Sequence, residues 1–131
     1  MLTGSCLCGG IRYRVDAEPE AIYICHCQQC RKAQGAALVT NAPVPEAAFH
    51  ILRGAQLLKA YESSPGKNRI FCSGCGSPIY SKTVKLPGVL RLRVGTINEP
   101  LAVRPVAHIY VASKANWWEI TDDLPQFKEG P

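Results

Sequence analysis

Apolar and polar residues alternate along most of this chain, which is the pattern of half-buried β-strands. In Ile11–Val15 and Val89–Val94 apolar side chains alternate with arginines, so each segment has one apolar and one basic face. Shorter β-like runs follow the same rule: Ala21–Ile24, Ala37–Asn41, Phe49–Arg53, Leu57–Tyr61, Arg69–Phe71, Pro78–Ser81 and Ala107–Val111. The pattern predicts a mainly β fold.

Turn residues separate these runs, and helical signals are few. Asn41-Ala42-Pro43, Ser64-Pro65-Gly66 and Pro87-Gly88 are expected to end strands, because Asn, Pro and Gly favour turns. Only Gln28–Gln34 and a turn near Ser113–Trp117 are predicted to be helical. One or two short helical turns therefore complete the expected fold.

Length and composition fit one domain, with 131 residues and 47% hydrophobic content. We expect residues 1–121 to form this domain, and residues 122–131, which lack periodicity, to form an irregular C-terminal tail. No apolar run approaches the ~20 residues of a membrane helix. The N-terminus shows no basic segment followed by an apolar one, so a cytoplasmic protein without membrane contact is predicted.

The seven cysteines fall into three clusters: Cys6 and Cys8, then Cys25, Cys27 and Cys30, then Cys72 and Cys75. A disulfide framework is disfavoured, because the number is odd and C-x-C pairs make strained bridges. Zinc closes structural sites with four protein ligands and leaves a fourth position open in catalytic sites that have three. The count therefore indicates two zinc ions per chain, one in a closed site and one in an open site.

The middle cluster lies where a strand is expected to pass into the helix Gln28–Gln34. Alternate side chains of a strand share a face, so Cys25 and Cys27 point to one side and His26 points to the other. The start of the helix then returns Cys30 to the same metal. These three cysteines form a local set of metal ligands, and His26 is a poor candidate for a fourth.

The outer clusters each provide only half of a tetrahedral site. Cys6 and Cys8 therefore need Cys72 and Cys75, whose run Phe71–Gly76 contains the glycines typical of a zinc knuckle. A shared ion closes a long loop of the chain and is expected to contribute to folding.

Net charge adds little evidence about function once the metal is counted. The formal charge of +5 counts every cysteine as neutral. Seven thiolates on two Zn²⁺ ions lower it to about +2. The remaining basic excess is small, so a nucleic-acid partner is not expected.

Three cysteine-bearing segments resemble the glutathione-dependent formaldehyde-activating enzyme family, which includes centromere protein V-like zinc domains: Gly4–Tyr13, Cys25–Gly35 and Phe71–Ser77. Val94–Pro100 is similar to a glycine-to-proline turn of the family. His108–Val111, with Lys114 and Trp117, is similar to its C-terminal signature.

The resemblance implies a β-tent fold, in which small antiparallel sheets surround zinc, and different roles for the cysteine clusters. It implies a structural zinc on Cys6, Cys8, Cys72 and Cys75. It implies a catalytic zinc on Cys25, Cys27 and Cys30. The implied activity joins formaldehyde to glutathione, and the reverse reaction is that of a carbon–sulfur lyase.

Glutathione carries two carboxylates, so its site is expected to offer cations. Arg31 and Lys32 directly follow the open cluster, and Lys67 and Arg69 precede Cys72. These four residues are the candidate substrate contacts. The identity of the thiol and aldehyde and the oligomeric state stay open.

Two other functions remain as alternatives. In a non-catalytic zinc module for protein or nucleic-acid binding, His26 or His108 closes the second site. In a redox protein, Cys25, Cys27 and Cys30 act as dithiols. His108 is expected to be a hydrogen-bonded interior histidine or to orient a zinc-site group. Asp122 is interpreted as a solubility charge.

Overall fold

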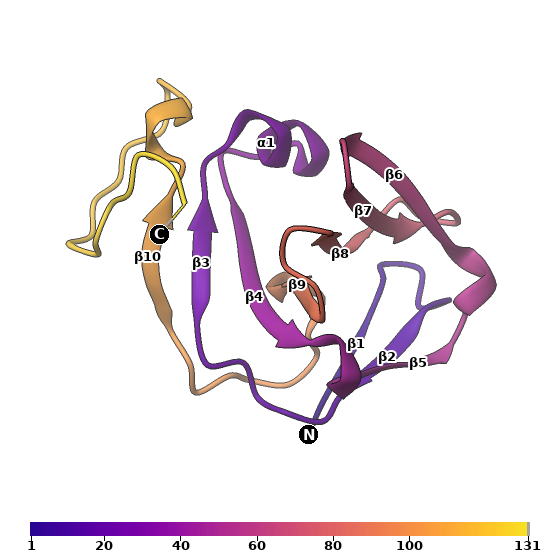
Figure 1. Ribbon diagram of the computed structural model, residues 1–131. Helices are drawn as coiled ribbons and strands as arrows, with labels where there is room; N and C mark the ends of the chain where they lie inside the picture. Colours follow the sequence, from indigo (N-terminus) through magenta and orange to yellow (C-terminus); the bar gives the residue numbers. More distant parts are fainter. Residues whose placement is uncertain (131) are drawn as a thin grey trace.

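The computed structural model describes residues 1–130 and contains two β-sheets and one α-helix, α1 (Gln28–Gln34) (Figure 1). The larger sheet has seven strands in the order β10 (Pro105–Ile109), β3 (Ile22–Cys25), β4 (Val39–Pro45), β9 (Val89–Arg93), β8 (Pro78–Thr83), β7 (Lys67–Cys72) and β6 (Leu58–Ser64). The smaller sheet has the order β1 (Leu2–Ser5), β2 (Arg12–Val15) and β5 (Phe49–Arg53). Short 3₁₀ turns occupy Glu46–Ala48, Ala55–Leu57, Val94–Thr96 and Val111–Ser113.

Each β-like run predicted from the sequence lies in or overlaps a strand. The bounds of Phe49–Arg53 and of the helix Gln28–Gln34 agree with the prediction. The strand Leu2–Ser5 was not predicted as such. The mainly β fold is therefore confirmed, although the second helical signal lies at Val111–Ser113 rather than at Ser113–Trp117.

The predicted turn at Asn41-Ala42-Pro43 is wrong, because β4 continues to Pro45. β3 pairs with β4 only as far as Asn41, so the rest of β4 has a free edge on that side. A proline is tolerated at such an edge, since it has no N–H to donate. The buried side chain of Val44 secures this half of the strand in the core.

One strand pairing departs from the expected antiparallel arrangement. β10 pairs with β3 in parallel, with His108 opposite Ile24 and Ile109 opposite Cys25. Parallel neighbours need a long connection, and here most of the chain separates the two strands. The parallel pair places the end of β10 beside the middle cysteine cluster.

The main core lies between the two sheets. It consists of Leu2, Cys6, Ile11, Tyr13, Val15, Val44, Cys72, Ile79, Leu90 and Leu92. The ring of Tyr13 packs against that of Phe49 at 5.0 Å between centroids, and its hydroxyl bonds to Thr96 Oγ1 at 2.7 Å. Cysteines of the first and third clusters thus belong to the same core as the aliphatic residues.

The tail from residue 122 has no helix or strand of its own within the described chain, but it is not detached. It returns along β10, where the N–H of His108 donates to Pro125 O and that of Tyr110 donates to Glu129 O, both at 2.9 Å. This segment, drawn in yellow in Figure 1, covers the outer edge of β10. The tail therefore shields backbone groups that an edge strand would otherwise expose.

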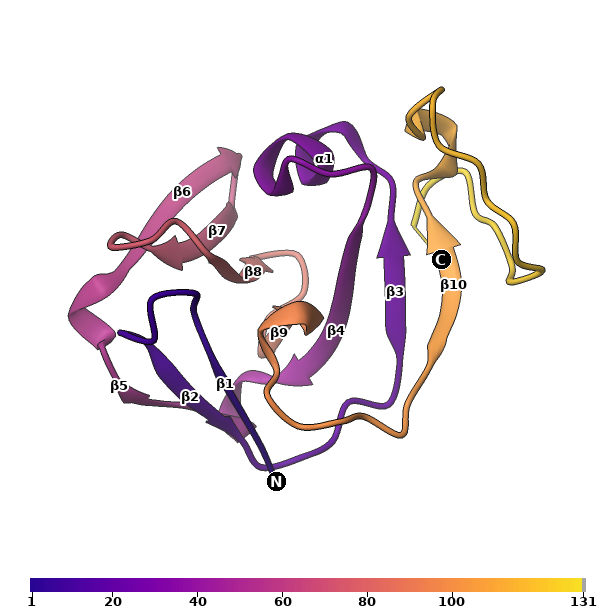
Figure 2. The same cartoon turned by 180° about the vertical axis from the view of Figure 1, so that it is seen from behind.

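Helix α1 lies at one end of the large sheet. Both views place it between the ends of β3 and β4 and the β6–β7 hairpin (Figures 1 and 2). The side chain of Gln29 donates to Ser63 O in β6 at 3.4 Å, which links the helix to that hairpin. No helix within residues 1–130 has the length and apolar character needed to cross a bilayer.

Candidate metal centres and active-site pocket

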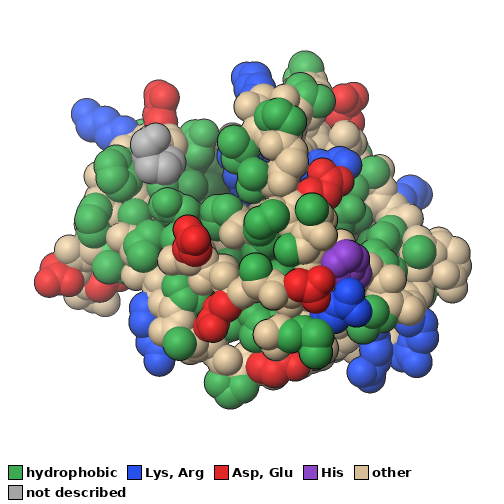
Figure 3. All heavy atoms as spheres, turned by 60° about the horizontal axis from the view of Figure 1, so that its bottom comes forward, with side chains coloured by type: hydrophobic (Ala, Val, Ile, Leu, Met, Phe, Trp, Pro, Cys, Tyr) green, Lys and Arg blue, Asp and Glu red, His purple; other side chains and the backbone are tan. Residues whose placement is uncertain are grey.

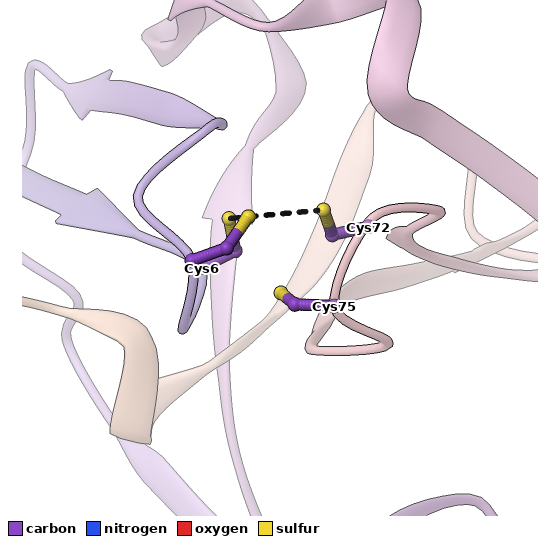
Figure 4. Close-up of side chains that lie close together, drawn as sticks. Cys6, Cys72 and Cys75 are labelled. Atoms are coloured by element: carbon purple, nitrogen blue, oxygen red, sulfur yellow. Dashed lines mark hydrogen bonds between the residues drawn. The ribbon is translucent and has the colours of Figure 1, made fainter.

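Cys6, Cys8, Cys72 and Cys75 come together as the sequence predicts, with their sulfur atoms all within 4.8 Å of one another. Figure 4 shows the sulfurs of Cys6, Cys72 and Cys75 directed toward a common point. Cys8 Sγ lies 3.5 Å from Cys6 Sγ and 3.9 Å from Cys72 Sγ. The site joins the turn after β1 to the turn after β7.

Backbone amides surround these sulfurs. Gly10 N–H donates to Cys8 Sγ at 3.4 Å, Ile11 N–H to Cys6 Sγ at 3.3 Å and Gly74 N–H to Cys72 Sγ at 3.3 Å. Such donors stabilise thiolates, which are the form of cysteine that binds a metal. Four sulfurs with inward-directed amides fit a tetrahedral zinc ion.

The second cluster forms at the junction of β3 and α1. Cys25 is the last residue of β3, Cys27 caps the N-terminus of α1, and Cys30 lies in the first turn. The Sγ of Cys27 accepts the Cys30 N–H at 3.2 Å. The three sulfurs lie within 4.8 Å of one another, and no further Cys, His, Asp or Glu of residues 1–130 belongs to this group.

This cluster favours negative charge on Cys30. Hydrogen bonds from Cys25 and Cys27 lower the pKa of the Cys30 thiol, and the neighbouring Arg69 guanidinium lowers it further. The Nη1 and Nη2 atoms of Arg69 each lie 3.7 Å from Cys30 Sγ. Hydrogen bonds to Cys27 and Cys30, together with burial, raise the pKa of the Cys25 thiol, which acts as a donor to these neighbours. A thiolate set with one position unfilled by protein fits a zinc ion that accepts an outside ligand.

A pocket of about 360 Å³ opens beside the three-cysteine cluster, a size within the range of small-molecule sites. Strands of the large sheet, helix α1 and the tail all contribute to its wall. It is lined by Cys25, Cys27, Gln28, Gln29, Cys30, Asn41, Lys67, Ser81, Arg91, Ile109, Tyr110, Ser113 and Gly130.

The four predicted substrate contacts lie in different places. Lys67 lines this pocket, and burial lowers the pKa of its ammonium group. Arg69 is buried and does not line this pocket, and its guanidinium contacts Cys30 Sγ, Gln29 Oε1 and Ser63 Oγ.

Arg31 and Lys32 lie away from this pocket. They line a shallow depression with Trp117. Arg31 donates to Ser113 O at 3.1 Å, so its guanidinium secures the segment after β10. Only Lys67 among the four candidates therefore lines the cysteine pocket.

Sequence reasoning missed Arg91, Asn41, Ser81 and Tyr110 as pocket residues. Arg91 and Arg93 lie on one face of β9, which the alternation in Val89–Val94 indicated. The sequence around β9 did not indicate that this face lies beside the cysteines. Within residues 1–130 neither Lys67 nor Arg91 forms a salt bridge. Tyr110 has a left-handed backbone, with φ 57° and ψ 37°, which is rare for a residue with a side chain.

The two buried histidines form a pair instead of joining a cysteine group. His26 Nε2 lies 2.8 Å from His108 Nδ1. Burial, and next the neighbouring His108, lower the pKa of His26 to about 4. His26 therefore faces away from the sulfurs, as predicted, and His108 is the expected hydrogen-bonded interior histidine.

The interpretation of Asp122 as a solubility charge is wrong, although its side chain is partly exposed. Its two carboxylate oxygens accept from His108 Nε2 at 3.1 and 3.0 Å. This contact depends on the return of the tail along β10, which the irregular sequence after residue 121 did not indicate.

Comparisons with known proteins agree with this geometry. The sequence profile of the glutathione-dependent formaldehyde-activating enzyme family matches residues 1–113. A Halomonas elongata protein named "Putative glutathione-dependent formaldehyde-activating enzyme" is 30% identical over 128 residues, covering 92% of this chain and 81% of that protein.

A solved structure shares the fold. The crystal structure of a Rhodobacter sphaeroides protein superposes with a TM-score of 0.65 at 21% identity, and the match covers 76% of this chain and 91% of that one. The family profile spans both cysteine clusters and the pocket strands up to Ser113. The chain belongs to the glutathione-dependent formaldehyde-activating enzyme family.

Proposed function

We propose that this protein is a zinc-dependent enzyme that makes or cleaves the carbon–sulfur bond between a thiol such as glutathione and formaldehyde. One observation carries the proposal. A three-cysteine cluster lies in the wall of a pocket that also presents Lys67 and Arg91, and neither cation has a carboxylate partner within residues 1–130. This combination suits a substrate that carries both a thiol and carboxylates.

The two clusters have different roles in this proposal. Cys6, Cys8, Cys72 and Cys75 would hold a structural zinc ion, since they complete a four-sulfur set within the core. Cys25, Cys27 and Cys30 would hold a second zinc ion that takes part in the reaction. When bound there, zinc supplies a fourth coordination position and lowers the pKa of a thiol that enters it.

The pocket side chains orient the thiol. Lys67 in β7 and Arg91 in β9 are half-buried, so they hold carboxylates with less screening than surface cations do. Arg91 can hold a carboxylate with two parallel N–H bonds, whereas Lys67 acts as a point charge. Glutathione therefore binds with its charged ends on the β7 and β9 side and its thiol toward the cysteines.

The reaction balances without an oxidant or reductant. The thiol gives up its proton, a sulfur lone pair forms the new bond to the formaldehyde carbon, and the C=O π electrons move to oxygen, which takes up a proton. The pocket offers N–H and O–H donors for this oxygen from Gln28 and Tyr110. In reverse, loss of the hydroxyl proton accompanies cleavage of the carbon–sulfur bond.

The setting of the cysteines suits a reducing compartment. None of the seven cysteines takes part in a disulfide. We propose the cytoplasm as the location, because thiols persist there.

On the face shown in Figure 3, acidic, basic and apolar side chains are mixed, which does not favour a nucleic-acid partner.

Cobalt substitution tests the proposal. Co²⁺ in a cysteine site absorbs visible light, and a thiol that enters the fourth position changes the spectrum. We expect the protein with cobalt at the three-cysteine cluster to respond to glutathione, and NMR to detect the hydroxymethyl adduct once formaldehyde is added. A metallated cluster whose spectrum ignores every thiol contradicts the proposal and favours the non-catalytic module. A response without adduct formation retains the thiol site and rejects formaldehyde as the co-substrate.

A further inference from the structure

A row of three side chains, two buried histidines and the partly exposed Asp122, runs from the C-terminal tail to the middle cysteine cluster. Asp122 accepts from His108 Nε2 at 3.0 Å, and His108 Nδ1 lies 2.8 Å from His26 Nε2. His26 is fully buried and His108 is 2% exposed. His26 itself lies between Cys25 and Cys27.

The direction of the hydrogen bonds follows from the carboxylate. An ionised Asp122 only accepts, so His108 carries its proton on Nε2 and, when neutral, presents a bare Nδ1. His26 must then donate from its own Nε2. Both imidazoles are therefore held in the same tautomer, and the Asp122 carboxylate sets this state for each of them.

Backbone contacts connect the row to the metal-binding segment. The His26 N–H donates to Ile109 O at 3.0 Å, and the His26 carbonyl accepts from Ser113 Oγ at 3.4 Å. His26 is thus held by its ring and by both of its peptide groups. A residue with so little freedom restricts the directions in which its two cysteine neighbours present their sulfurs.

We propose that Asp122, His108 and His26 are positioning residues that hold Cys25 and Cys27 in the geometry needed to bind metal. The tail contributes to metal binding through Asp122. The inference rests on the proposed function, because it assumes that the three-cysteine cluster holds zinc. None of the three side chains lines the pocket, so they act through the cysteines and not on the substrate.

The test compares two neighbouring carboxylates in the zinc-loaded protein. Asp122→Ala removes the acceptor of the row. Asp123→Ala removes an exposed carboxylate for which the structure shows no hydrogen bond and serves as the matched control. A chromogenic chelator measures zinc release, and the four-cysteine site in the same molecule serves as an internal reference.

We expect Asp122→Ala to speed release from the three-cysteine cluster by about tenfold, as happens when a group that orients a metal ligand is lost. Release from the four-cysteine site and from the Asp123→Ala protein should match the wild type. Equal acceleration at both sites means a general loss of stability and overturns the proposal, as does an Asp122→Ala protein that behaves like the control.

NMR provides a readout that does not need activity. Long-range proton–nitrogen correlations in the wild type should show His26 and His108 protonated on Nε2 only, and Asp122→Ala should give His108 a mixture of tautomers. A wild-type His26 or His108 protonated on Nδ1 overturns the proposed direction. If the wild type holds only one zinc ion, the proposed function fails at its second site, whereas these spectra still decide the arrangement of the row.

Discussion

The guanidinium of Arg69 lies against the sulfur of Cys30, with Nη1 and Nη2 each 3.7 Å from Sγ. Arg69 comes from β7 and Cys30 from α1, so the contact crosses from one end of the large sheet to the helix. A buried cation beside a buried thiolate offsets part of the charge of three sulfurs gathered around one metal.

This contact predicts that Arg69→Gln weakens zinc binding at the three-cysteine cluster. Glutamine is neutral and too short to place two N–H groups on the sulfur, so we expect affinity to fall by about tenfold. Competition with a chelator of known affinity measures the change. Arg12→Gln, on an exposed arginine, should leave the affinity unchanged, and an equal drop in both variants contradicts the prediction.

The two cysteine clusters should differ in their effect on folding. Cys72 is 0% exposed and joins the turn after β7 to the N-terminal turn, so Cys72→Ser should lower the free energy of unfolding by several kcal/mol. Cys27→Ser alters a half-buried residue at a helix cap and should preserve the fold. Circular dichroism melts of the two zinc-loaded variants make the comparison. Equal destabilisation would show that the division into structural and functional sites is wrong.

Lys67 and Arg91 should govern the choice of thiol. Arg91→Gln is expected to raise KM for glutathione about tenfold or more, because charged hydrogen bonds contribute roughly 1.5–3 kcal/mol each. The same change should have little effect with a neutral thiol of similar size. Lys67→Gln should act in the same direction, and the glutathione preference of the wild type should shrink as salt rises. Lys82→Gln is the control, since Lys82 is exposed and pairs with Glu46. A uniform loss for both thiols argues against a role in carboxylate binding.

Gly4 lies directly beneath the ring of Tyr13. A Cβ at Gly4 would be 2.0 Å from Tyr13 Cζ, so Gly4→Ala must displace a buried aromatic ring. We expect a loss of about 1–3 kcal/mol or more, as in other overpacked cores. Gly95→Ala is the matched control, because no atom lies within 4 Å of its Cβ position. Urea unfolding of both variants measures the difference, and similar midpoints would contradict the packing described here.

Tyr13 should make stability fall at high pH. Burial raises the pKa of its hydroxyl to about 12 from a usual value of 10.0. The folded state therefore keeps a proton that the unfolded state loses. The contribution of the Tyr13 hydroxyl to the free energy of unfolding is complete below pH 10. It declines by about 2–3 kcal/mol as the pH rises to 12. Tyr13→Phe removes this group, so the stability difference between wild type and variant should decrease over that interval. A constant difference from pH 9 to 12 would show that the hydroxyl titrates normally.

Local sequence determined a large part of this protein. Cys25, Cys27 and Cys30 meet because a strand end and a helix start lie within six residues, and local backbone geometry is enough to gather their sulfurs. Alternation identified the strands for the same reason, since a period of two is a property of the extended chain itself. The pairing of the first and third clusters followed from ligand number, and the helix bounds followed from local signals.

Tertiary structure alone decided what surrounds the second cluster. Arg91 reaches the cysteine pocket because β9 pairs with β4, and Asp122 reaches His108 because the tail returns along β10. Arg31 and Lys32, although adjacent to Cys30 in sequence, point elsewhere because the helix turns them away from the pocket. Proximity in sequence constrains only the next turn of the backbone. Contacts across a sheet depend on strand order and register, which arise from the packing of the whole chain.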